Sequence, residues 1–284
     1  MIQFRHIARA LGAALLLLLV ACGGPSVPLT GTVLDAYTGE PVAGATVEVG
    51  RAKATSDAAG KYQLAKWSAK GKLRASAAGY EPAEIDLAQQ PVDQASGAPT
   101  RDISIRPNVL SGAVTERYTG APVADAVVKV SDTISTTTGT DGRYTLAGVP
   151  PSFSVSVTAP DHDEHTAQVD KTTQLDVDLR SNILQGKVTE RDTGKPIAGA
   201  TVRVGDVTAT TEADGTYRAP GVPEGATVEI TAEGYTAASE TAPDAASFDV
   251  ALQANVLRGA VTDQYTGEPV AEATVKAGDT TAST

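Results

Sequence analysis

One short phrase occurs four times in this chain, and the repetition constrains the fold more than any other feature. The phrase is YTGEPVAGATVEVG at 37–50, YTGAPVADAVVKVS at 118–131, DTGKPIAGATVRVG at 192–205 and YTGEPVAEATVKAG at 265–278. A glycine precedes each phrase on a strand-like segment, and these glycines recur at nearly regular intervals: Gly31, Gly112, Gly186 and Gly259. A chain with such a period consists of repeated units, which have to be found before domains are assigned.

Two further sequence marks keep the same spacing. A Gly-x-Tyr sequence occurs at 60–62, 142–144 and 215–217. The second mark follows each of these tyrosines at one constant distance, at Gly79, Asp161 and Gly234. The first copy is slightly longer than the others, and its surplus falls in AQQPVDQASGAPT at 88–100, whose composition is typical of a loop. Three sequence features with the same repeat spacing indicate one fold repeated three times, followed by part of a fourth copy.

Within each copy, apolar and polar residues alternate as they do in a half-buried strand. Ala45, Val47 and Val49 share one face, whereas Thr46 and Glu48 share the other. The later copies keep the apolar set and vary the opposite face, which indicates one core face and one solvated face. The third copy contains seven short strand-like segments, near 183–189, 199–204, 207–211, 215–219, 226–232, 235–241 and 247–253. Short strands at this spacing predict a β-sandwich.

The order GTV, TG-x-P-V-x-G-A-x-V-x-V, T-x-x-D-G-x-Y and V-x-A-x-GY resembles the carboxypeptidase regulatory-like domain. That resemblance implies a transthyretin-like sandwich and brings no shared catalytic residues. We therefore expect an all-β chain of tandem seven-stranded transthyretin/Ig-like sandwiches, three complete and one truncated. The expected divisions are a signal peptide at 1–21, a tether at 22–28, repeats at 29–107, 108–181 and 182–254, and a truncated fourth repeat at 255–284.

Two local departures from the pattern lead to expectations of their own. Asp161-His162 replaces the Gly-Tyr pair of the other copies, so we expect a different corner in the second repeat. The fourth copy breaks off less than halfway through the repeat, so its apolar face, with Val261, Val270 and Val275, should lie open. We expect this sequence to be a fragment of a longer chain.

The N-terminal segment has the composition of a secretory signal. A basic start with Arg5 and Arg9 precedes the apolar run AALLLLLV at 13–20, which is too short to span a membrane. The junction LVAC resembles the bacterial lipobox, in which cleavage precedes a cysteine that is then lipidated. Because Cys22 is the sole cysteine, we expect it to carry the lipid and to anchor the protein, outside the cytoplasm, to a bacterial membrane.

The overall charge narrows the possible partners. The formal net charge is −11, which disfavours binding to nucleic acid. Besides the membrane that the lipid would enter, the candidate partners are a cell-surface protein or a polysaccharide.

The sequence contains two candidates for a ligand site. DHDEH at 161–165 places Asp161, His162, Asp163 and His165 together, a set that could hold a metal ion or could form a polar loop tip. Exposed tyrosines can bind sugars, and the phrase places Tyr37, Tyr118 and Tyr265 in loops, although packing on the neighbouring turn is the simpler interpretation.

The sequence predicts no enzyme and no cofactor, because it contains no Gly-x-Ser-x-Gly elbow and no bulky residues near its carboxylate pairs. The expected function is a structural stalk or interaction module. The alternative is an accessory, carbohydrate-binding region of a larger secreted enzyme whose catalytic domain lies beyond residue 284.

Overall fold

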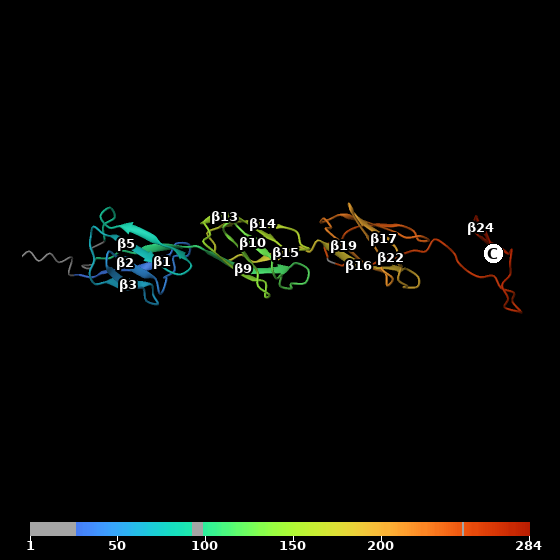
Figure 1. The fold of residues 1–284 in the computed structure, drawn as a ribbon, viewed down its shortest axis with the longest axis horizontal. Helices are drawn as coiled ribbons and strands as arrows, with labels where there is room; N and C mark the ends of the chain where they lie inside the picture. The colour runs from blue at the N-terminus through green and yellow to red at the C-terminus, as the bar shows by residue number, and fades with distance from the viewer. Residues whose placement is uncertain (1–26, 93–98, 246) are drawn as a thin grey trace, which may run out of the picture. The chain divides into compact units, whose positions relative to one another are not determined.

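The computed structural model describes residues 27–92, 99–245 and 247–284, and every regular element in them is a β-strand (Figure 1). The predicted all-β fold of tandem sandwiches is confirmed. The chain divides into two units, residues 1–108 and residues 109–284, which are described separately below.

The first unit is a single sandwich of two four-stranded sheets. One sheet has the order β4-β1-β8-β6 and the other the order β3-β2-β5-β7. Leu29, Val47, Leu73 and Ile105 are fully buried between the sheets. The strands are β1 (Leu29–Asp35), β2 (Thr46–Val49), β3 (Ala52–Thr55), β4 (Lys61–Leu64), β5 (Lys72–Ser76), β6 (Tyr80–Glu81), β7 (Ala83–Asp86) and β8 (Ile103–Pro107).

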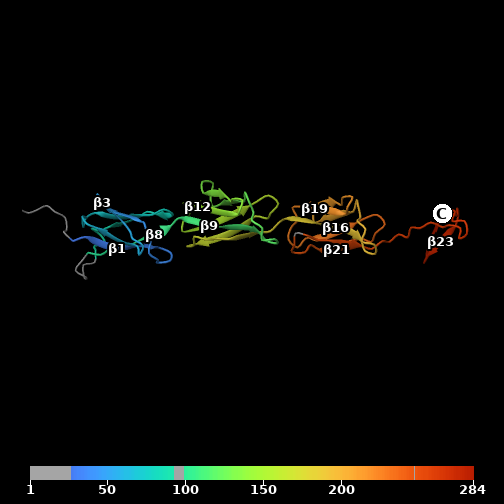
Figure 2. The same cartoon turned by 90° about the horizontal axis from the view of Figure 1, so that it is seen from below.

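The first strand of this sandwich changes partner halfway along its length. Residues 29–32 of β1 pair antiparallel with β4, and residues 33–35 pair parallel with β8. Figure 2 shows β1 beside β8, the last strand of the same repeat. The first and last strands of the repeat are therefore parallel neighbours.

The second unit begins with a repeat of the same plan. Its sheets have the orders β11-β10-β13-β14 and β12-β9-β15, and β9 is antiparallel to β12 and parallel to β15. The strands are β9 (Val109–Glu116), β10 (Val127–Lys129), β11 (Ser135–Thr137), β12 (Arg143–Ala147), β13 (Ser152–Thr158), β14 (His165–Asp170) and β15 (Val177–Leu179).

The third repeat follows in the same unit. Its sheets have the orders β18-β17-β20-β21 and β19-β16-β22. All seven strands expected from the sequence are present, and several begin or end a few residues short of the expected limits. They are β16 (Ile183–Glu190), β17 (Thr201–Val204), β18 (Val207–Thr210), β19 (Thr216–Pro220), β20 (Thr227–Thr231), β21 (Ala238–Thr241) and β22 (Val250–Leu252).

A buried hydroxyl group fixes the corner that the repeated phrase forms. In the third repeat, Thr211 Oγ1 accepts the N–H of Ala200 at 2.8 Å and donates to the carbonyl of Ile197 at 2.6 Å. Ser56 and Thr138 make the same pair of hydrogen bonds in the first and second repeats. One side chain thus satisfies two buried backbone groups of the corner, as burial requires.

The predicted difference at the Asp161 corner is wrong as far as the backbone is concerned. Gly79 and Gly234 have φ angles of 80° and 84°, and Asp161 adopts the same left-handed conformation at 63°. Aspartate tolerates this region better than most residues with a side chain, which explains why the corner is retained.

The first repeat differs from its seven-stranded expectation by one short strand. Its β6 pairs with β8 at Tyr80 and Pro107, and in the second and third repeats this contact is a single bridge, His162 to Ser181 and Tyr235 to Ala254.

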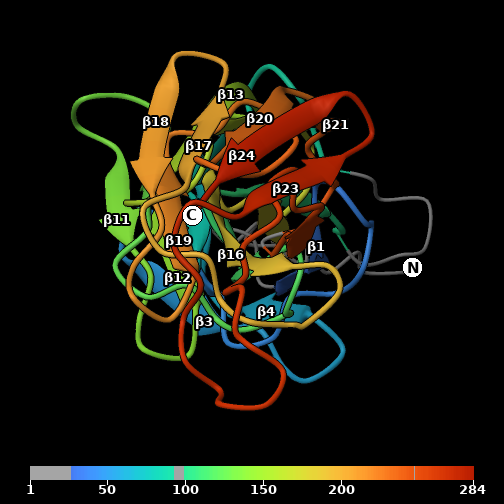
Figure 3. The same ribbon diagram turned by 90° about the vertical axis from the view of Figure 1, so that its right-hand side faces the viewer.

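The segment 255–284 contains one hairpin, β23 (Thr274–Ala277) with β24 (Thr280–Ser283) (Figure 3). Val270 and Val275 are each 38% exposed, whereas Ile197 and Val202, their equivalents in the third repeat, are 6% and 0% exposed. Two of the three valines expected on an open apolar face are therefore exposed, whereas the third, Val261, is half-buried.

Candidate functional site

Each complete repeat places a glycine and a tyrosine against one backbone carbonyl near the middle of its first strand. Tyr62 Oη donates to the carbonyl of Arg101 at 2.5 Å. Tyr144 and Tyr217 donate in the same way to Leu175 and Phe248, both at 2.7 Å. These tyrosines are 3–4% exposed and are among the largest side chains in their cores.

The glycine is required because the same carbonyl occupies the place of a side chain. A Cβ atom on Gly31, Gly112 or Gly186 would lie 1.9, 1.7 or 1.9 Å from that oxygen, far inside van der Waals contact. The glycine therefore lets the first strand approach the segment that leads into the last strand.

A carboxylate completes this arrangement by binding the backbone N–H of the residue that follows the glycine. Asp102 Oδ1 accepts the N–H of Thr32 at 2.7 Å. Asp176 and Asp249 accept the N–H groups of Ala113 and Lys187, both at 2.8 Å. The carboxylate satisfies a backbone donor at the point where the first strand changes partner.

Burial and this carboxylate both disfavour ionisation of the core tyrosines. Burial is the larger cause, and the neighbouring aspartate adds to it. Together they raise the pKa of Tyr144 and of Tyr217 to about 12. The pKa of Tyr62 is raised in the same way by burial and by Asp102. These hydroxyls remain neutral donors across the physiological pH range.

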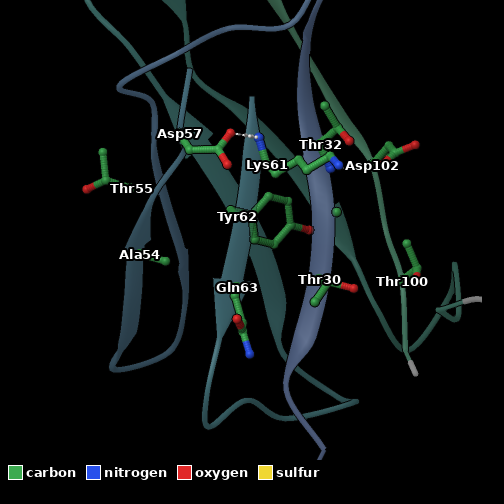
Figure 4. Close-up of a pocket in the computed structure, with 11 residues that line it drawn as sticks. Thr30, Thr32, Ala54, Thr55, Asp57, Lys61, Tyr62, Gln63, Thr100 and Asp102 are labelled. Carbon is green, nitrogen blue, oxygen red and sulfur yellow. Dashed lines mark hydrogen bonds between the residues drawn. The ribbon is translucent and has the colours of Figure 1, made fainter. Parts of the chain in front are cut away.

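A polar groove of about 650 Å³ lies beside this arrangement in the first repeat. Figure 4 shows β1 and β4 side by side, with the Tyr62 ring between them. The Asp57 carboxylate accepts the backbone N–H of Lys61 at 2.8 Å. The polar groups that line the groove come from Thr30, Thr32, Thr55, Asp57, Lys61, Gln63, Thr100 and Asp102.

The equivalent place in the third repeat also forms a groove, of about 400 Å³. Its polar groups come from Gln185, Thr208, Thr210, Glu212, Thr216 and Arg218. Both grooves offer hydroxyl, amide, carboxylate and cationic groups, which can form hydrogen bonds with a polar ligand. In both, the aromatic ring is buried and does not provide an exposed stacking surface.

The loop tyrosines proposed as sugar contacts lie in three different settings. Tyr37 is half-buried and hydrogen-bonds Arg106. Tyr118 is half-buried and its hydroxyl donates to Asp244 at 2.9 Å. Tyr265 is 93% exposed. Each belongs to a different copy, and the structure does not gather Tyr118 and Tyr265 into one surface.

Two of the three carboxylates of the DHDEH cluster face arginines, and the third, Glu164, accepts from the Ser156 hydroxyl at 2.6 Å. Asp161 accepts from Arg218 at 2.9 Å, and Asp163 accepts from Arg180 at 2.7 Å. His162 Nδ1 lies 2.7 Å from the carbonyl of Pro160, and His165 begins β14. Over the residues that the structure describes, no group of three or more His, Cys, Asp or Glu is placed to hold a metal ion.

The predicted lipid site, Cys22, and the signal segment lie outside the described residues. Within the described ranges, no helix has the length and apolar character needed to cross a bilayer.

Sequence reasoning missed two kinds of residue that organise the repeats. One kind is the aspartate that binds the first strand: Asp102, Asp176 and Asp249. Apart from the loop insertion in the first copy, each lies at nearly the same distance from its first-strand glycine, and this constant spacing could have identified the aspartates. Arg180 is 7% exposed, and a buried arginine is not expected from sequence because arginine is rarely buried.

The fold and its repeated corner define a class of protein: an all-β chain of tandem sandwiches, each closed by its own first and last strands. The family model of the carboxypeptidase regulatory-like domain matches three times, at residues 28–103, 109–180 and 183–253. Since these matches cover most of the chain, the protein belongs to the carboxypeptidase regulatory-like domain family, and the resemblance seen in the sequence is confirmed.

Among solved structures, the chain is similar at low identity to several bacterial proteins. The Bacillus anthracis TIE protein is 14% identical, with a TM-score of 0.23, and the match covers 80% of this chain and 51% of that one. The present chain thus spans about half the length of the TIE protein. A streptococcal ancillary pilin is 10% identical, with a TM-score of 0.22 and coverage of 80% and 99%. GBS52, the minor pilin of Streptococcus agalactiae, is 12% identical, with a TM-score of 0.27 and coverage of 55% and 100%. A search of curated proteins gave no match.

Proposed function

We propose that this protein is an extracytoplasmic lipoprotein whose tandem regulatory-like repeats act as a structural stalk or interaction module, anchored through Cys22 to a bacterial membrane. The observation that carries the proposal is the succession of three sandwiches, each with a core of its own. Three such domains in series would separate a bound partner from the membrane anchor. This role requires no catalytic chemistry.

The connections between successive repeats support a stalk. The last strand of the second repeat ends at Leu179 and the first strand of the third begins at Ile183. Only residues 180–182 connect the two strands, which is too short a segment to act as a flexible Gly/Ser linker.

A binding role rather than an enzymatic one fits the chemistry of the grooves. Asp57 and Asp102 each already accept backbone N–H groups, so their oxygens serve the fold. The matching family is a regulatory-like domain. The candidate partners are a cell-surface protein or a polysaccharide, and nucleic acid is disfavoured by the net charge of −11.

The anchor is tested by replacing its cysteine. We expect the parent protein to partition with membranes and the mature N-terminus to be a lipidated Cys22. The Cys22→Ser variant should be uncleaved or released in soluble form. Mass spectrometry that finds cleavage at another residue and an unmodified Cys22 would overturn the anchoring proposal.

A second candidate function is carbohydrate binding as an accessory region of a larger secreted enzyme. The polar groove of Figure 4 favours it, because hydroxyl, amide and carboxylate groups line one surface and a similar groove recurs in the third repeat. Calorimetric titration of the chain with cell-surface polysaccharides tests this function. Binding that Gln63→Ala weakens and Gln168→Ala leaves unchanged would support it. No heat with any polysaccharide would reject it, and the gene sequence beyond Thr284 would show whether a catalytic domain follows.

A further inference from the structure

The end of the second repeat carries a buried arginine with partners in two repeats. Arg180 directly follows β15 and is 7% exposed. Its Nη1 atom donates to the Asp163 carboxylate of its own repeat at 2.7 Å. The same atom donates to the carbonyl of Val222 in the third repeat at 3.1 Å. One guanidinium therefore joins the two repeats.

Further hydrogen bonds surround this contact. The N–H of Val222 donates to the carbonyl of Asn182 at 2.7 Å, so Val222 is bound through both of its backbone groups. The Tyr118 side chain hydrogen-bonds Arg180, and the Tyr118 hydroxyl donates to Asp244 of the third repeat at 2.9 Å. Each partner fixes the direction of another, which makes the cluster more rigid than a single bond would be.

A second bridge crosses the same junction at its exposed rim. Arg218 of the third repeat donates to the Asp161 carboxylate of the second at 2.9 Å. Both side chains are about half exposed, at 54% and 53%, so this pair adds little to the buried contacts.

The third repeat carries different residues at the equivalent positions. Gln253 stands in place of Arg180, and Asp192 stands in place of Tyr118. The Gln253 amide donates to the Asp192 carboxylate at 2.9 Å, so this pair closes within one repeat. Just beyond it, Val256 is 49% exposed and Leu257 is 81% exposed.

We propose that Arg180 is a latch that fixes the third repeat against the second, so that the two repeats move as one body. Arginine suits this place because its planar guanidinium presents donors in several fixed directions, towards a carboxylate on one side and a carbonyl on the other. The Gln253–Asp192 pair forms no such bridge, so the third repeat is not held to the following segment in this way. The inference deepens the proposed stalk function, but its test does not depend on the lipid anchor.

The first test is amide hydrogen exchange on the full chain in detergent micelles. Arg180→Gln introduces the residue that the third repeat carries. It should accelerate exchange of the Val222 amide on the order of ten-fold, because hydrogen bonds to a charged group are lost. The Tyr217 amide, in the core of the third repeat, should keep its rate. Unchanged exchange at Val222 would overturn the latch.

Two further variants separate the junction from general destabilisation. Arg203→Gln is the matched control, since Arg203 is exposed and donates to the Gly205 carbonyl within its own repeat. It should leave Val222 exchange unchanged. Tyr118→Phe removes only the hydroxyl bound to Asp244 and should accelerate Val222 exchange on the order of three-fold. Arg180→Gln could also accelerate exchange within the second repeat. In that case the proposal depends on Tyr118→Phe, and unchanged Val222 exchange in that variant would overturn it.

The second test measures the distance between the repeats. In a full chain carrying Cys22→Ser, spin labels are placed on cysteines at exposed Thr137 in the second repeat and exposed Thr208 in the third. The parent should give a narrow distance distribution, and Arg180→Gln a broad one. A parent distribution that is already broad, or a variant distribution as narrow as the parent's, would overturn the proposal while leaving the anchoring test untouched.

Discussion

The first-strand glycine of each complete repeat lies where the backbone leaves no room for a side chain. In the third repeat, the Phe248 carbonyl that would meet a Cβ on Gly186 is the one that accepts from Tyr217. At Gly259, the equivalent position in the fourth copy, nothing lies within 4 Å of the same atom. Gly259 is therefore a control position for Gly186: the same substitution meets a backbone carbonyl at one site and open space at the other.

Replacing Gly186 by alanine should destabilise the third repeat by about 2 kcal/mol or more, because the added methyl group forces two backbone segments apart. Gly259→Ala should leave stability unchanged. Differential scanning calorimetry of the two variants measures the difference. Equal melting profiles would contradict the placement of Gly186 against Phe248.

The core tyrosines make stability sensitive to strongly alkaline pH. Their folded-state pKa of about 12 lies above the unfolded value of about 10. The folded state therefore holds these protons more tightly. The resulting stabilisation is complete below about pH 10 and is lost as the pH rises towards 12.

Melting temperatures measured from pH 9 to 12.5 should accordingly fall across the upper half of that range. Tyr217→Phe removes one of the titrating hydroxyls and should make this fall shallower, although it lowers stability at neutral pH by removing the bond to Phe248. A pH profile with the same slope in the variant would show that Tyr217 does not titrate in this way.

Strand alternation determines which face of each sheet is buried. In β17, Val202 and Val204 are fully buried, whereas Thr201 and Arg203 are exposed. β17 pairs with β18 on one side and β20 on the other, so its inward face meets the core along its whole length. Most side chains in this core are small, so truncating any one of them leaves a cavity that its neighbours cannot fill.

Val202→Ala should cost about 1–3 kcal/mol of unfolding free energy, since it deletes two buried methyl groups at a fully enclosed site. Arg203→Ala, one residue away on the solvated face, should cost less than about 0.5 kcal/mol. Urea denaturation of both variants provides the comparison. Matching midpoints would refute the assignment of the two faces.

Much of the element structure could be predicted from the sequence because it depends on local patterns. The buried faces and the short strands of each repeat follow from the alternation of apolar and polar residues and from the spacing of the segments. The pairing of the first strand with the last could not be predicted, since alternation does not say which strands are neighbours. For the same reason the role of Asp249 and the burial of Arg180 remained hidden: both depend on partners that are distant in the sequence, Lys187 and Val222.

At the scale of the whole molecule, burial is divided among three separate cores. Their buried residues run from Leu29 to Ile105, from Leu110 to Leu179 and from Leu184 to Leu252. Within the described residues, none of the three clusters includes a side chain from 255–284. The hairpin β23–β24 is thus outside every closed core.

Deleting residues 258–284 should therefore leave the main melting transition unchanged and should raise solubility, because it removes the exposed Val270 and Val275. Calorimetry and a solubility assay on the shortened chain measure both effects. The matched comparison is deletion of an equal length from the third repeat, which should abolish one transition. A clear fall in the main transition after removal of 258–284 would show that this segment stabilises the third repeat.

The parallel pairing of first and last strands also determines how a repeat responds to tension. The chain enters the third repeat at the start of β16 and leaves it at the end of β22, and the two strands pair at Val188–Val250, Thr189–Ala251 and Glu190–Leu252. A force that pulls the two ends apart slides these strands along each other, so it loads all the hydrogen bonds between them at once rather than opening them one by one. The same pairing occurs in β1 with β8 and in β9 with β15. Each sandwich therefore carries a shear clamp across its own ends, and a series of them resists stretching up to a threshold before any one gives way.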